Sequence, residues 1–247
     1  MMLNVSQLLG ILHESRRLVT LNVSHNAVDS LRSQEHAHFN LPRLTTLSFL
    51  LIPIDTAYDI MTSVRIPNCA ALTIKCIQGK QLRTAGFFGS ETAHLGTSIR
   101  SILAVLPRIQ LSLTSLAVFC SGMGKDAELG IHLPILPMLK KPSSVGWLEK
   151  IHSSLASPPD IELNITGSEG ANKRPPMLKK SSPFVTVLNI YGSPSEAHRW
   201  MKHLGTPTII DGVFKRQLPN LRVLKFDVEG LKGKDLLNMV RTRYGGG

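Results

Sequence analysis

The sequence predicts an α/β fold, a single solenoid over residues 1–247 in which short parallel strands alternate with helices. Three observations lead to this prediction. A nine-residue apolar pattern recurs along the chain, helical periodicity follows several copies of it, and some copies are about 25 residues apart. Hydrophobic residues make up 43% of the 247 residues, which is enough to form a continuous core.

The recurring pattern places apolar residues at fixed positions around a proline. Its three full copies are LPRLTTLSF (residues 41–49), IPNCAALTI (66–74) and LPNLRVLKF (218–226). Two looser copies without the proline are RLVTLNV (17–23) and VTVLNI (185–190). Each copy ends in alternating apolar residues, such as Leu47 and Phe49, so we predict a short strand with one buried row.

Helical periodicity follows several predicted strands. The clearest helix begins at Ser193-Pro194-Ser195-Glu196, a capping box with proline at the first helical position. After the strand at Leu47, we expect Asp55 to cap a helix whose inward residues are Ala57, Ile60, Met61 and Val64. Further helices are predicted around residues 8–12, 98–106, 144–155 and 236–240.

The spacing of the predicted strands matches the period of leucine-rich repeats. Equivalent positions are Leu3, Leu21, Leu47, Leu72, Leu116, Leu163, Leu188 and Leu224. Their separations are 18, 26, 25, 44, 47, 25 and 36 residues, and values near 25 are typical of such a solenoid. The long steps predict loop insertions near residues 77–97 and 121–143, and a third loop lies at 167–182. A doubly wound α/β domain is the alternative, although its buried strands are typically continuous apolar runs.

Polar residues alternate with the buried row and form a second row that faces away from the core. In a solenoid this row lines the concave surface, which predicts a binding face. The exposed aromatic residues Phe119 and Tyr191 are the strongest candidates for anchoring a partner. The predicted binding residues are Asn22, Ser48, Lys75, Phe119, Asn164, Asn189, Tyr191 and Lys225.

The segment LPNLRVLKFDVEGLKGKDLLNMVRTRYG, the LPRLTTLSF copies and the helix SPSEAHRWMKHL together resemble the C-terminal leucine-rich-repeat region of F-box proteins of mushroom-forming fungi. The resemblance implies that the repeat region captures a protein substrate for a ubiquitin ligase. A Skp-type adaptor would bind only through an F-box, and no F-box-like LP-x-E helix precedes the first repeat. We therefore expect either a fragment of a longer protein or a chain that has lost ligase docking.

The charge balance offers a rival interpretation. Lys and Arg number 28 and Asp and Glu 17, which gives a formal net charge of +11. Such an excess is typical of proteins that bind nucleic acid or acidic surfaces. The densest basic segments, residues 140–141 and 173–180, lie in proline-rich loops without interleaved aromatic residues, so protein recognition remains the preferred prediction.

Sequence motifs for catalysis or metal binding were sought and not found. GxSxG, HExxH, GxGxxG and the Walker pattern do not occur, and Gly122-Met123-Gly124-Lys125 lacks the leading glycine of a phosphate loop. The cysteines Cys69, Cys76 and Cys120 have no metal-ligand spacing, so we expect small buried hydrophobic side chains in a reducing compartment. No apolar run is long enough to span a membrane. The sequence thus predicts a non-catalytic protein of the cytoplasm or nucleus, without cofactor or metal.

Overall fold

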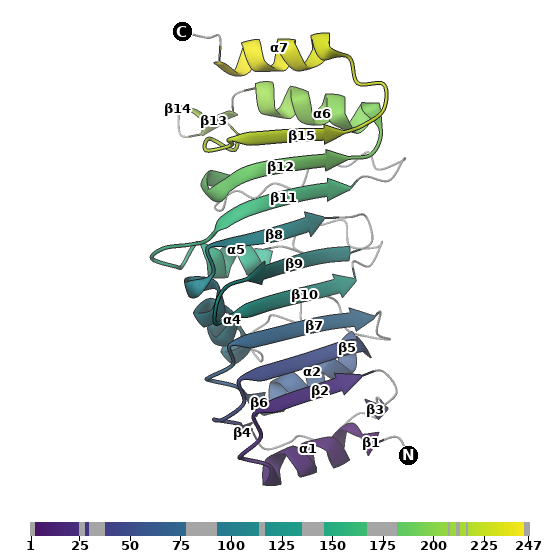
Figure 1. The fold of residues 1–247 in the computed structure, drawn as a ribbon, viewed down its shortest axis with the longest axis vertical. Helices are drawn as coiled ribbons and strands as arrows, with labels where there is room; N and C mark the ends of the chain where they lie inside the picture. Colours follow the sequence, from purple (N-terminus) through teal and green to yellow (C-terminus); the bar gives the residue numbers. More distant parts are fainter. Residues whose placement is uncertain are drawn as a thin grey trace. The chain divides into compact units, whose positions relative to one another are not determined.

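The computed structural model has an α/β fold in which most paired strands are parallel (Figure 1). The chain divides into two compact units. Unit 1 comprises residues 1–109 and 116–159, and unit 2 comprises residues 110–115 and 160–247. The structure describes residues 3–24, 28–29, 38–77, 93–113, 117–134, 146–166, 182–206, 208–210, 213–215 and 217–244.

The sheet of unit 1 has the strand order β9-β10-β7-β5-β2, and all of its pairs are parallel except the β9–β10 hairpin. Its strands are β2 (Thr20–Ser24), β5 (Thr46–Pro53), β7 (Ala71–Ile77), β9 (Ala117–Met123) and β10 (Glu128–Pro134). Short strands β1 (Leu3–Asn4) and β3 (Val28–Asp29) pair with each other, as do β4 (Phe39–Asn40) and β6 (Val64–Arg65). The helices are α1 (Val5–Glu14), α2 (Ile54–Ser63), α4 (Ala93–Val105) and α5 (Gly146–His152).

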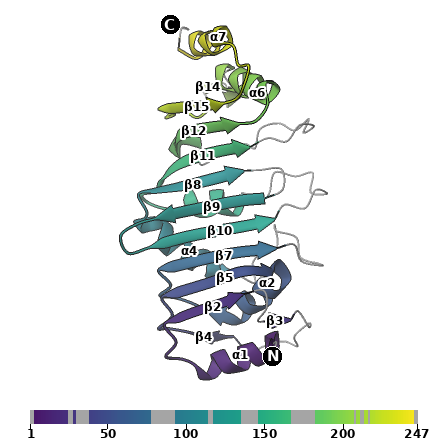
Figure 2. The same ribbon diagram turned by 45° about the vertical axis from the view of Figure 1, so that its right-hand side comes forward.

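The predicted leucine register is confirmed for three positions of unit 1. Leu21 pairs with Leu47, and Leu47 pairs with Leu72, at separations of 26 and 25 residues. Leu47 and Leu72 are buried, and α2 and α4 lie behind these strands in Figure 1 and in the turned view of Figure 2. The helices of the described residues therefore cover the leucine side of the sheet and leave its polar side open.

Three predictions for unit 1 differ from the structure. Leu3 belongs to β1, which pairs with β3 and not with the main sheet. Asp55 lies in the first turn of α2 and is not its N-cap, because that helix starts at Ile54 directly after Pro53, whose φ of −57° already suits a helix start. The stretch 121–143, predicted as a loop insertion, contains the end of β9 and all of β10.

The strand predicted around Leu116 differs as well. Of the strand predicted at residues 113–118, Leu113 is the last residue of β8 (Arg108–Leu113), and Ala117 and Val118 begin β9. Residues 114–116, and with them Leu116, lie outside the described residues. The other two predicted insertions fall mostly outside the described residues, although α4 begins inside the stretch 77–97.

The sheet of unit 2 has the strand order β8-β11-β12-β15. Leu163, Leu188 and Leu224 are partners in register across three parallel strands, as the sequence predicts. The elements after β8 are β11 (Asp160–Thr166), a 3-10 turn η1 (Ser182–Phe184), β12 (Val185–Tyr191), α6 (Pro194–Gly205), β13 (Thr208–Ile210), β14 (Val213–Lys215), β15 (Val223–Asp227) and α7 (Gly233–Tyr244). β13 and β14 form an antiparallel hairpin in the long step before β15.

The capping box predicted for α6 is present. The Ser193 hydroxyl accepts a hydrogen bond from the Glu196 amide, and the Glu196 carboxylate accepts one from the Ser193 amide. The predicted stripe of Ala197, Trp200, Met201 and Leu204 is buried. The fixed start and buried face hold α6 against α7.

Candidate functional site

The candidate site of unit 1 is the side of its sheet that the helices leave open. We call this the open face of unit 1, and it is formed by Asn22, Ser24, Ser48, Leu50, Thr73, Lys75, Phe119, Ser121, Gly130 and His132. Each of these residues alternates with a buried neighbour along its strand, as in the pair Thr73 and Ile74. The open face therefore consists of side chains in fixed register on a hydrogen-bonded sheet.

The predicted residues of unit 1 fall in two adjacent rows of this face. Asn22 and Ser48 are register partners in one row. Lys75 belongs to the next row, which starts at Ser24 on β2 and continues through Leu50 on β5, Lys75 on β7 and His132 on β10 to Phe119 on β9. We call Leu50, Lys75, His132 and Phe119 the Lys75–His132 row. Because Lys75 and Phe119 are separated only by His132, the structure brings these two predicted residues into one cluster.

Two aromatic rings in this row stack on each other. The ring centroids of Phe119 and His132 are 4.0 Å apart, and their planes are inclined by 18°. Phe119 is 37% exposed and Leu50 is 38% exposed. Burial, and secondarily the ammonium group of Lys75, hold the pKa of His132 below its usual value. The row combines apolar surface with one fixed cation and one titratable ring.

The predicted residues of unit 2 are arranged differently from the prediction. Asn164 and Asn189 are 7% and 4% exposed, so they do not form a solvated row. The Asn189 amide nitrogen donates hydrogen bonds to the Asn164 side-chain oxygen at 2.6 Å and to Glu162 at 2.9 Å, and Asn164 donates to the Ser112 hydroxyl at 3.1 Å. The two asparagines are therefore buried members of a polar ladder across β8, β11 and β12, since their side-chain polar groups can bond laterally to the adjacent strand.

Lys225 and Tyr191 lie beside this ladder and remain exposed. Lys225 is the register partner of Asn189, and Tyr191 is the register partner of Thr166 and Asp227. The ring of Tyr191 is 38% exposed. The side-chain oxygen of Asn189 is buried and has no hydrogen-bond partner among the described residues. Unit 2 thus offers a mixed surface over a rigid polar network.

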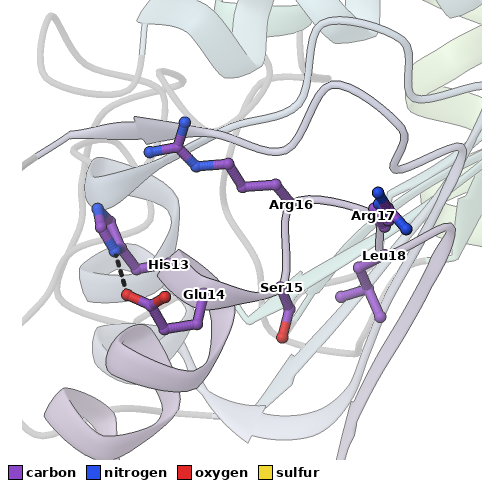
Figure 3. A pocket seen from close by; sticks show the side chains of 6 residues that line it. All are labelled: His13, Glu14, Ser15, Arg16, Arg17 and Leu18. Atoms are coloured by element: carbon purple, nitrogen blue, oxygen red, sulfur yellow. Dashed lines mark hydrogen bonds and ion pairs between the residues drawn. The ribbon is translucent and has the colours of Figure 1, made fainter.

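A hollow of about 680 Å³ lies at the C-terminal end of α1 (Figure 3) and contains no predicted site residue. It is lined by His13, Glu14, Ser15, Arg16, Arg17 and Leu18. Its His13 and Glu14 side chains lie 3.1 Å apart and bond to each other. No group of three His, Cys, Asp or Glu side chains in the described part of the chain could hold a metal ion.

The predicted basic segments at residues 140–141 and 173–180 lie outside the described residues, so nucleic-acid binding through them stays a prediction. Within the described ranges, no helix is both long and apolar enough to cross a membrane. Gly122 and Gly124 occupy the end of β9 and the turn before β10, which is not the strand-to-helix junction of a phosphate loop.

Two residues of the Lys75–His132 row were not among the predicted site residues. His132 lies in ELGIHLP, where Leu129, Ile131 and Leu133 alternate with exposed positions. That alternation is the signal that would have identified β10 and placed His132 on the open face. Leu50 was missed because LSFLLIP reads as a nearly continuous apolar run. It faces outward by alternation after Phe49, and the backbone bulge at Leu51, with φ of 57°, returns Ile52 to the buried side.

No family model, no curated protein and no solved structure matches this chain.

Proposed function

We propose that this chain is a non-catalytic protein-recognition module that contacts its partner through the open face of unit 1. The observation that carries the proposal is the Lys75–His132 row, in which Leu50 and Phe119 expose apolar surface beside polar side chains on a paired sheet. Aromatic and apolar anchors surrounded by polar residues are typical of protein-binding surfaces. Because strand pairing already orders the backbone of these residues, binding requires little further ordering of the backbone.

We further propose that the strands belong to a leucine-rich-repeat-like solenoid and that the module is the substrate-receptor region of an F-box-type ubiquitin ligase component. The in-register leucines at steps of 26 and 25 residues support the repeat interpretation. The antiparallel β9–β10 hairpin is a departure from one strand per repeat. In this role the repeat region would bind the protein substrate, and an F-box would supply the contact to a Skp-type adaptor.

Site-specific photo-crosslinking tests the proposed face. A photoreactive phenylalanine analogue replaces Phe119 in one variant and the exposed Arg100 of α4 in a matched control. We expect the photoreactive residue at position 119 to form a single covalent adduct of defined mass with the partner protein. Added wild-type chain, which carries no photoreactive residue, should reduce the yield of this adduct. Lys75→Glu chain should compete poorly, whereas Lys150→Glu chain, altered on the helix side, should compete as well as wild type. Equal adducts from both crosslinker positions would refute the proposal.

The open side of unit 2 is tested in the same competition. Lys225→Glu reverses an exposed charge on β15, and Lys202→Glu reverses one on α6. If the strand side of unit 2 also contacts the partner, Lys225→Glu chain competes less well than Lys202→Glu chain. Equal competition would restrict the contact to unit 1.

A further inference from the structure

The Lys75–His132 row brings a lysine and a histidine together on adjacent strands. Leu50, Lys75, His132 and Phe119 come from four adjacent strands and are consecutive register partners. Neighbouring strands are about 4.8 Å apart, so the Lys75 ammonium and the His132 ring can reach the same ligand atom. Apolar side chains stand at both ends of the row, Leu50 beside Lys75 and Phe119 beside His132.

The position of the His132 ring is fixed by its neighbour. Phe119 covers one face of the ring by stacking at 4.0 Å. On the other side of β10, Lys75 is the register partner of His132 on β7. A ligand that reaches the row can therefore meet a nitrogen donor of His132 and the ammonium group of Lys75 together.

The charges around His132 favour an anion. Lys75 is the charged group that faces it from β7, and Phe119 faces it from β9. Glu128 lies on the same side of β10 but four residues away, about 13 Å along the strand. No carboxylate stands among the register partners of this row. The free protein thus opposes protonation of His132, as its lowered pKa reflects.

We propose that the Lys75–His132 row binds an extended acidic segment of the partner protein, with one carboxylate between Lys75 and His132 and apolar side chains against Leu50 and Phe119. This inference depends on the proposed protein-recognition function and specifies the partner's chemistry. A carboxylate fits better than a phosphate group, because the row supplies one fixed cation and no arginine fork. A stacked nucleic-acid base fits less well, because one face of Phe119 is already covered.

Binding of such a segment takes up a proton. In the free protein His132 is neutral at pH 7 to 8, because its pKa lies below the usual value of about 6.5. A carboxylate beside the ring favours the imidazolium form and raises the pKa in the complex. The affinity for the acidic segment therefore increases as the pH falls from 8 to 6. The increase is up to about tenfold for each pH unit by which the carboxylate raises the pKa of His132.

Fluorescence anisotropy with labelled peptides and the full chain tests this inference. The probe is a hexapeptide of alternating glutamate and leucine, and the matched control peptide has glutamine in place of glutamate. We expect at least about threefold tighter binding of the glutamate peptide at pH 6 than at pH 8. His132→Gln should remove that pH dependence, and Lys75→Glu should abolish binding. Lys150→Glu on the helix side should change neither.

Four outcomes would overturn the inference. These are equal binding of the glutamine peptide, a pH dependence that survives in His132→Gln, no binding of the glutamate peptide, and stronger Lys75-dependent binding of a labelled hexauridylate. The crosslinking experiment separates this failure from failure of the proposed function. If position 119 still yields its competed adduct, the face recognises a protein and only the acidic chemistry is wrong.

Discussion

The guanidinium group of Arg243 on α7 donates a hydrogen bond of 2.5 Å to the carbonyl oxygen of Leu218, whose backbone lies in the left-handed region at φ of 48°. The same guanidinium donates to the carbonyls of Leu204 at the end of α6 and of Gln217. Arg243 is only 4% exposed. One buried side chain therefore connects α7 to the end of α6 and to the loop before β15.

Replacement of this arginine should destabilise unit 2 strongly. Arg243→Met removes four charge-assisted hydrogen bonds, three to carbonyl oxygens and one to the Tyr244 hydroxyl, and leaves the carbonyl oxygens without this donor. We expect the loss to cost about 3 kcal/mol or more. Urea unfolding followed by circular dichroism measures the loss. Arg241→Met changes an exposed arginine on the same helix and should have an effect within about 0.5 kcal/mol. Similar effects of both variants would contradict the role assigned to Arg243.

The polar ladder of unit 2 should behave as a coupled unit. Asn189→Ala deletes the donor of two hydrogen bonds and leaves the Asn164 oxygen unsatisfied, so we expect a loss of about 2 kcal/mol. Asn164→Ala should cost a similar amount, and the double variant should lose less than the sum, with a coupling of about 1 kcal/mol. Thr166→Ala, at an exposed position of β11, is the control. Strict additivity in denaturant unfolding would show that the ladder is not coupled.

The contact between α6 and α7 should depend on pH. His198 lies 2.8 Å from the Asp235 carboxylate, and the Pro194 carbonyl and then Asp235 raise the pKa of His198 above its usual value. A raised pKa in the folded state stabilises the fold below the unfolded pKa of about 6.5, and this contribution is lost as the pH rises through the folded pKa. The melting temperature of wild type should therefore exceed that of His198→Gln at pH 6, and the gap should narrow by pH 8.

His203, on the same helix, does not affect the comparison of wild type with His198→Gln. Burial lowers the pKa of His203 on the same helix, which acts in the opposite direction but is present in both proteins. The difference in melting temperature between wild type and Asp235→Asn should likewise become smaller from pH 6 to pH 8. A gap of the same size at pH 6 and pH 8 would show that the ion pair does not contribute.

The three cysteines should be unreactive in the folded protein. All three thiols are free and buried, and burial raises the pKa of Cys69 to about 11 and those of Cys76 and Cys120 to about 12. The thiolate is the reactive form, so a disulfide reagent at pH 8 should label the native chain slowly. The same reagent in urea should label three thiols quickly. Rapid labelling under native conditions would be inconsistent with this burial.

Much of the fold could be predicted because apolar alternation has a direct structural cause. Leu47 and Leu72 occupy equivalent places in copies of one pattern, and they pair in register on β5 and β7. The α6 helix was predictable from local capping chemistry at Ser193 and Glu196. These signals lie within a few residues, so no tertiary knowledge was needed to interpret them.

The remaining features depend on contacts that are distant in sequence. The alternation that exposes Lys75 also predicts an exposed Asn189. In the structure Asn189 is buried and donates hydrogen bonds to side chains of the neighbouring strand β11, which the local sequence does not indicate. His132 belongs to the site because β10 lies between β7 and β9, a pairing that links segments far apart in the sequence. The pattern in ELGIHLP was present, but its spacing did not follow the 25-residue steps.

The β9–β10 hairpin also has a kinetic consequence for the assembly of unit 1. Its closest pair, Met123 and Glu128, is 5 residues apart in the chain, whereas the pair Leu72 and Leu129 is 57 residues apart. Short loops close in well under a millisecond, and long-range strand pairing is slower. The hairpin should therefore nucleate folding, and Ile131→Val should slow refolding more than Leu47→Val does for an equal loss of stability.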